Sequence, residues 1–205
     1  MGSLIMARRR RQLEPKGKDE DVRMMAGLIT AAVVSIVVGA AMFIAPPVDV
    51  GIEEGALASA VQHFEDRQVN VLGLKTDVSR KKSIEALFDQ AKSRFEKIHL
   101  LFNNAGVVNG GSPTPIWNLP REDWDWVMGV NFDGVLYGVQ AFVPHMLGHG
   151  EGGHIVNTAS VAGITAGGGN YGVSKHAVLA LTESLERDLV AAGGEVRASV
   201  LCPGF

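Results

Sequence analysis

The sequence predicts an α/β fold with a mostly parallel sheet, and three observations support this prediction. The chain has 205 residues, of which 46% are hydrophobic, which suits one compact domain with a sizeable core. After about residue 52, short apolar segments alternate with longer stretches of helical periodicity, a pattern typical of βαβ units. Small or polar residues follow several of the apolar segments, where a parallel sheet carries its ligand sites.

The first 48 residues differ from the rest in composition. Residues 1–23 are charged and mixed, so we expect a disordered arm. Residues 24–48 contain no charged side chain, and Pro46 and Pro47 lie near their end. A run of this length can cross a membrane, which takes roughly 20 apolar residues. The alternative is a buried stretch that substitutes for the first strand–helix–strand unit of a soluble domain.

The charges around the apolar run bear on its orientation if it spans a membrane. Seven Lys and Arg residues precede it, and only Arg67 follows within 20 residues. The positive-inside rule would then place everything after Val48 outside the cytoplasm.

Residues 49–205 predict alternating elements. The stretch 83–95 places Ile84, Leu87, Phe88, Ala91 and Phe95 on one face of an amphipathic helix. By the same reasoning the expected helices are 53–67, 83–95, 122–147 and 173–192, and the expected strands are 69–75, 97–102, 153–160 and 195–204.

The ends of the predicted strands carry candidate ligand-binding residues. Asp77, the segment Asn103–Gly106, Ser160 and the pair Pro203–Gly204 follow four successive strands. Each is also an ordinary turn former, so a single one would carry little weight. Because the carboxyl ends of parallel strands meet at one edge, the set together indicates a ligand site.

The segment YGVSK, residues 171–175, holds a candidate acid/base pair. In a helix, Tyr171 and Lys175 lie one turn apart on the same face. A phenol in water has a pKa of about 10, too high for an efficient base at pH 7. A nearby ammonium group favours the phenolate. The alternative is an ordinary tyrosine and a surface lysine.

These motifs together resemble the short-chain dehydrogenase/reductase family. The matching residues are Asn103–Gly106 in "NNAG", Asn131 in "VNFDG", Ser160 in "NTASVAG", Tyr171 and Lys175 in "YGVSK", and Cys202–Gly204 in "CPG". The resemblance covers about Ile52 to Phe205. It implies a Rossmann-like, doubly wound parallel sheet and an NAD(P)-dependent oxidoreductase that interconverts an alcohol and a carbonyl by hydride transfer. It also implies a homodimer or tetramer that pairs through the two long helices.

The resemblance assigns a role to each catalytic candidate. Tyr171 would exchange the proton of the substrate hydroxyl. Lys175 would favour the phenolate and bond the nicotinamide ribose. Ser160 would hold the substrate oxygen. Asn131 would bind a water that links Lys175 to solvent, although a capping or helix-kink role is the alternative.

It also assigns contacts with the cofactor, NAD or NADP. Asp77 would bond the adenine amino group, unless it caps the helix that starts near Ser79. Asn104, Ala105 and Gly106 would line the adenine-ribose side. Pro203 and Gly204 would face the nicotinamide, as would Tyr171 and Lys175.

Two departures from the family predict an incomplete fold, with an atypical first βαβ unit and no last strand. The glycine fingerprint that binds pyrophosphate is missing, since Ala31 and Val33 occupy the places of its second and third glycines after Gly27. Phe205 follows the PG motif directly, where the family continues. The first departure predicts weak cofactor binding.

Composition and spacing also bear on other functions. A net charge of −3 gives no general attraction to nucleic acid. His145 and His149 are four residues apart, but the sequence offers no obvious carboxylate or third ligand, so we expect no metal site. The alternative function is a catalytically impaired remnant that acts as a membrane-tethered or partner-binding module. We expect a cytoplasmic location, where nicotinamide cofactors are found, with a membrane anchor as the alternative.

Overall fold

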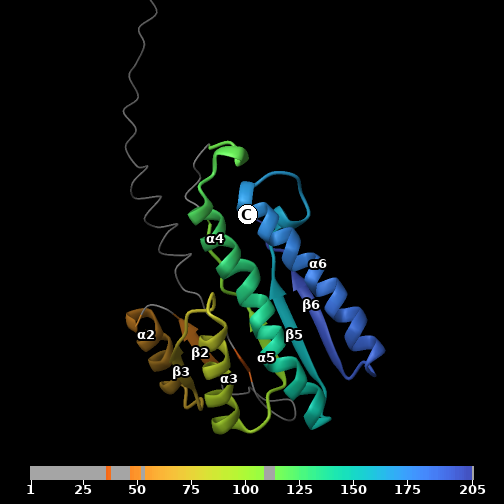
Figure 1. The fold of residues 1–205 in the computed structure, drawn as a ribbon. Helices are drawn as coiled ribbons and strands as arrows, with labels where there is room; N and C mark the ends of the chain where they lie inside the picture. The colour runs from red at the N-terminus through yellow and green to blue at the C-terminus, as the bar shows by residue number, and fades with distance from the viewer. Residues whose placement is uncertain (1–35, 38–46, 52–53, 109–113, 205) are drawn as a thin grey trace, which may run out of the picture.

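The computed structural model describes residues 36–37, 47–51, 54–108 and 114–204, which form a six-stranded sheet with helices packed against it (Figure 1). The strand order is β3-β2-β1-β4-β5-β6. The pairs β2–β3, β4–β5 and β5–β6 are parallel. This arrangement confirms the predicted α/β fold with a mostly parallel sheet.

The first part of the sheet is atypical, as the sequence predicted. Strand β1 has only two residues, Ile36–Val37, and pairs antiparallel with both of its neighbours. Strand β2, Pro47–Gly51, begins within the apolar run. Within the described ranges, no helix is long and apolar enough to cross a membrane. Residues 1–35 and 38–46, which hold the predicted arm, most of the apolar run and the fingerprint positions, lie outside those ranges.

The elements that follow match the predicted order. They are α2 (Glu54–Glu65), β3 (Leu72–Lys75) and α3 (Lys81–Phe95). Strand β3 begins three residues later than expected. Helix α3 buries Ile84, Leu87 and Ala91, which confirms the predicted amphipathic face.

The long helix predicted over 122–147 is three successive helical segments. They are α4 (Arg121–Met128), a π-helical turn η2 (Gly129–Asp133) and α5 (Gly134–His149). This π turn contains Asn131, and π turns often mark functional sites. Helix α5 packs beside α3. The rings of Phe88 and Phe142 meet edge to face, with their centroids 5.1 Å apart.

The C-terminal half positions the candidate site. Strand β4 (Leu100–Asn103) leads through the short helical turn η1 (Ile116–Asn118) to α4, and β5 (Gly153–Thr158) leads through the turn η3 (Val161–Gly163) to α6. Helix α6 spans Gly169–Ala191 and β6 spans Val196–Leu201. Because α6 begins four residues earlier than expected, Tyr171 lies inside it, in its first turn.

The largest core cluster lies between the middle of the sheet and helices α3 and α5. Leu101 of β4 and Ile155 of β5 are fully buried there against Phe142 and Met146 of α5. This packing holds β4 and β5 rigidly, and both strands end at the candidate site.

Candidate active site

Tyr171 and Lys175 meet at the carboxyl end of β5. The Nζ atom of Lys175 donates a hydrogen bond of 2.8 Å to the carbonyl oxygen of Thr158, the last residue of the strand. The same atom lies 5.7 Å from the centroid of the Tyr171 ring. The side chain of Lys175 is therefore held beside the tyrosine and is not an ordinary surface lysine.

Burial perturbs this lysine strongly. Lys175 is only 3% exposed. Desolvation lowers its pKa from the ordinary value of 10.5 to about 8, and the nearby Cys202 opposes the change. At pH 7 the amine of Lys175 is still mostly protonated, so a positive charge stays next to the phenol of Tyr171.

Asn131 joins two segments of the site through its side chain. Its Oδ1 accepts a hydrogen bond of 2.7 Å from the backbone N–H of Val107. Its Nδ2 donates to the Val107 carbonyl and to the Oγ of Ser174, both at 2.9 Å. The fully buried amide thus ties the segment after β4 to helix α6. The predicted contact with a water stays a prediction.

The NNAG segment passes close to this pair. A Cβ atom added to Gly106 would lie 3.4 Å from Nζ of Lys175 and 3.5 Å from Oδ1 of Asn131. Asn104 accepts a hydrogen bond of 2.8 Å from the hydroxyl of Thr158, and Ala105 is buried. A backbone without a side chain therefore faces the catalytic candidates at Gly106.

Ser160 and the PG motif reach the same edge. Ser160 is buried, and its Oγ accepts a hydrogen bond of 3.2 Å from the N–H of Ala162, so it caps η3. The N–H of Val161 donates to the carbonyl of Pro203 at 2.9 Å, which places Pro203 and Gly204 next to Ser160 in space. Turn η3 also packs directly on α6, because a Cβ at Gly163 would lie 2.8 Å from the carbonyl oxygen of Lys175.

Asp77 makes local contacts after β3. Its carboxylate accepts bonds from the N–H and the hydroxyl of Ser79, at 3.0 and 2.6 Å, and lies 3.2 Å from Nε of Arg80. These bonds organise the turn that leads into α3. Asp77 is not the cap of this helix, because α3 begins at Lys81 and its N-cap residue is Arg80, with no side-chain cap bond. The contact with adenine stays a prediction.

Sequence reasoning missed one residue of the site, Ser174. It is fully buried, accepts from Asn131, and donates a bond of 2.7 Å to the carbonyl of Tyr171. In the YGVSK motif, Ser174 lies between Tyr171 and Lys175, where the sequence analysis assigned no role. A small polar residue on the buried face of a helix was the available signal.

The expectation that no further ligand accompanies the paired histidines is wrong for His149 only, because His145 is not part of the candidate group. The structure brings His99 and Glu151 to His149, so that one candidate ligand atom from each lies within 4.8 Å of the others. Glycine at 150 adopts a left-handed conformation (φ 68°) that ends α5 and turns Glu151 back toward His149. His99 directly precedes β4, far away in the sequence.

The comparisons with known proteins bear on the family and the fold of the chain. A family model described as "short chain dehydrogenase" matches residues 39–205. A curated relative from Lactiplantibacillus plantarum, a "CLA biosynthesis dehydrogenase/reductase", is 37% identical over 76% of this chain and 54% of its own length. The chain spans about half the length of the curated relatives it matches.

Two solved structures carry a dinucleotide. A short-chain dehydrogenase/reductase from Burkholderia phymatum in complex with NAD is 51% identical, with a TM-score of 0.73, over 77% of this chain and 56% of that one. A metagenomic short-chain oxidoreductase in complex with NADP is 26% identical, with a TM-score of 0.72, over 78% of this chain and 72% of that one.

Proposed function

Because the chain belongs to the short-chain dehydrogenase family, we propose that it interconverts an alcohol and a carbonyl with NAD or NADP, using Tyr171 as the acid/base. One observation carries the proposal: the buried Lys175 lies beside the Tyr171 ring at the carboxyl end of β5. Ligands bind at this edge in open parallel sheets. The substrate class and the cofactor are both part of the proposal.

The proton chemistry follows from the side chains. In the oxidative direction the Tyr171 oxygen accepts the proton of the substrate hydroxyl, and in the reductive direction it returns a proton to the carbonyl oxygen. The positive charge of Lys175 favours the phenolate that accepts the proton. The Ser160 oxygen accepts from Ala162, so its own hydroxyl hydrogen is free to hold the substrate oxygen in place.

The described residues suit the nicotinamide end of a dinucleotide. The absence of a side chain at Gly106 leaves room for close approach next to Lys175. Pro203 and Gly204 would face the nicotinamide. Asn104 and Ala105 would line the adenine-ribose side together with Gly106, and Asp77 would lie toward the adenine. When bound, NAD or NADP would supply the hydride acceptor or donor. Weak binding stays a prediction, since the fingerprint positions lie outside the described ranges.

We also infer that the working form is a homo-oligomer in the cytoplasm. Exposed apolar side chains on the long helices support pairing between subunits, and they include Trp126 (50% exposed), Leu147 (42%), Val173 (44%) and Val190 (53%). The proposed cofactor is held in the cytosol, which supports the location. Light scattering after gel filtration measures the first inference, and detergent-free fractionation of cells measures the second.

The proposed function is tested by turnover of NADH or NADPH with a panel of carbonyl compounds. We expect Tyr171→Phe to lower kcat by about 10²- to 10⁴-fold, the usual contribution of a positioned acid/base. Tyr137→Phe is the matched control, since Tyr137 in α5 is the other tyrosine of the chain and packs against the core. Equal turnover by the two variants would contradict the role of Tyr171.

A further inference from the structure

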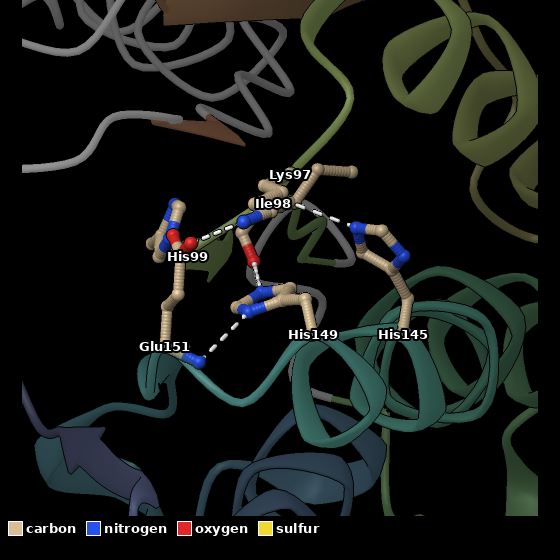
Figure 2. A network of polar contacts seen from close by, with 6 residues as sticks. All are labelled: Lys97, Ile98, His99, His145, His149 and Glu151. Atoms are coloured by element: carbon tan, nitrogen blue, oxygen red, sulfur yellow. Dashed lines mark hydrogen bonds and ion pairs between the residues drawn. The ribbon is translucent and has the colours of Figure 1, made fainter.

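Figure 2 shows a group of histidines with a glutamate. The group lies where β4 and β5 begin, and the candidate active site lies where these strands end. His99 directly precedes β4, His149 ends α5, and Glu151 precedes β5. The two strands end at Asn103 and Thr158, beside Lys175. The group is thus separate from the proposed chemistry.

His149 is already oriented as a metal ligand. Its Nε2 lies 3.0 Å from the carbonyl oxygen of Ile98, to which it can only donate. Its Nδ1 therefore carries the lone pair, and it accepts a long bond of 3.2 Å from the N–H of Glu151. Histidine ligands almost always donate their other ring nitrogen to a carbonyl or carboxylate in this way. The bond from the N–H of Glu151 must open when Nδ1 binds a metal.

His99 and Glu151 complete the group. The Nε2 of His99 lies 2.9 Å from Oε2 of Glu151, and the rings of His99 and His149 have centroids 4.7 Å apart. The Nδ1 of His99 is buried and has no hydrogen-bond partner, the one such side-chain atom found in the described part of the chain. Because Nδ1 and Nε2 of an imidazole point in different directions, Nε2, which faces Oε2, is the nitrogen of His99 that is offered to a metal.

Lys97 is the feature that opposes a cation here. Its Nζ pairs with Oε1 of Glu151. Oε2 faces His99 and is the oxygen turned toward the imidazoles. The ammonium lowers the electrostatic attraction for a divalent ion but does not occupy the ligand atoms of the two histidines.

We propose that His99, His149 and Glu151 bind one zinc ion or a chemically similar divalent transition metal. Two imidazoles and a carboxylate are a ligand set that zinc accepts, with water as the fourth ligand. A tetrahedral site has ligand atoms roughly 3.3 Å apart, so the group must contract from its present spread of up to 4.8 Å. The half-exposed side chain of Glu151 can make that movement. The ion would join the start of β4 to the end of α5.

The test is a titration of the full chain, purified without a histidine tag, with zinc chloride by calorimetry and with cobalt chloride by visible absorption. We expect one equivalent of metal and a tetrahedral cobalt spectrum. His99→Gln and Glu151→Gln should each weaken binding at least about tenfold, as even outer-shell losses often do. Lys97→Met should tighten binding, since it removes the opposing charge.

The control is His63→Gln, which removes an exposed histidine of α2 outside the group and should leave binding unchanged. Circular dichroism confirms that each variant is folded, and Glu151→Gln alters only an exposed side chain. Absence of saturable binding, or equal affinities for wild type, Glu151→Gln and His63→Gln, would overturn the site. Tyr171→Phe should bind metal normally, so the outcome is independent of the proposed dehydrogenase function.

Discussion

At the scale of single residues, Lys175 couples the stability of the protein to the chemistry proposed for it. Its ammonium group is buried and donates a hydrogen bond to the backbone carbonyl of Thr158. Replacing a buried charge by an apolar group of similar size is often neutral or stabilising. The lysine thus lowers stability while it supplies the positive charge that the tyrosine needs.

The lowered pKa of Lys175 predicts a specific pH dependence of stability. The folded lysine releases its proton near pH 8, whereas the unfolded lysine keeps it to about its ordinary value of 10.5. The unfolded state therefore binds more protons between these values, and the free energy of unfolding rises with pH across this window. The free energy of unfolding increases by about 3 kcal/mol across this window, at about 1.4 kcal/mol for each unit by which the pKa is lowered. Below pH 8 the lysine is protonated in both states and the full desolvation penalty applies.

Urea denaturation at pH 7.5, 8.5 and 9.5 measures this effect. Lys175→Met is the control, since it cannot titrate. We expect the stability of wild type relative to Lys175→Met to increase with pH. A constant difference between the two proteins would show that the pKa of the lysine is not lowered in the folded state.

At the scale of elements, the contact of α5 with β4 depends on a glycine. A Cβ atom at Gly138 would lie 2.3 Å from Oδ1 of Asn103. The Nδ2 of Asn103 donates a hydrogen bond of 2.8 Å to Oδ1 of Asn157. Gly138→Ala must therefore displace a buried, bonded side chain, and we expect a loss of about 1–3 kcal/mol in unfolding free energy. Thermal or urea unfolding measures it.

Gly148→Ala in the same helix is the matched control. No atom lies within 4 Å of a Cβ added there. The extra methyl group raises helix propensity, so the variant should gain up to about 1 kcal/mol. Destabilisation by both variants to the same extent would mean that backbone effects, and not the contact with Asn103, decide the cost at Gly138.

The elements also show what sequence could and could not predict. The strands and α3 follow from apolar periodicity, and the residues of the candidate site follow from motifs at strand ends. The start of α6 was missed because Gly167, Gly168 and Gly169 read as a loop, whereas Gly169 with φ of 56° already opens the helix. The π turn at Asn131 has no local signature, since it depends on how one helix meets both β4 and α6.

At the scale of the whole molecule, burial is deeper in β5 than in α2 and β3. Strand β5 contains the fully buried Ile155 and Asn157. Helix α2 has no fully buried side chain among its described residues, and β3 contributes only partly buried leucines to the core. Cooperative stability in proteins follows the density of such buried contacts.

This difference in burial predicts the order of amide hydrogen exchange. Amides of β5 should exchange only through global unfolding, and amides of α2 and β3 should exchange through a smaller local opening. Native-state exchange at increasing urea, read by mass spectrometry of peptides, measures both. Identical opening free energies for α2 and β5 would show that the sheet unfolds as one unit.

The bond between Asn103 and Asn157 has a consequence for how the sheet assembles. The two residues are direct partners in the parallel register of β4 and β5, and Asn157 continues through its Nδ2 to the hydroxyl of Thr182 in α6, at 3.0 Å. If one strand slipped by a residue, its amide would move to the other face of the sheet, and both amides would lose their hydrogen-bond partner. The register of the two strands that end at the candidate site is therefore fixed by polar groups that form their hydrogen bonds only in the native alignment. Apolar neighbours alone would discriminate far less between the native alignment and a shifted one.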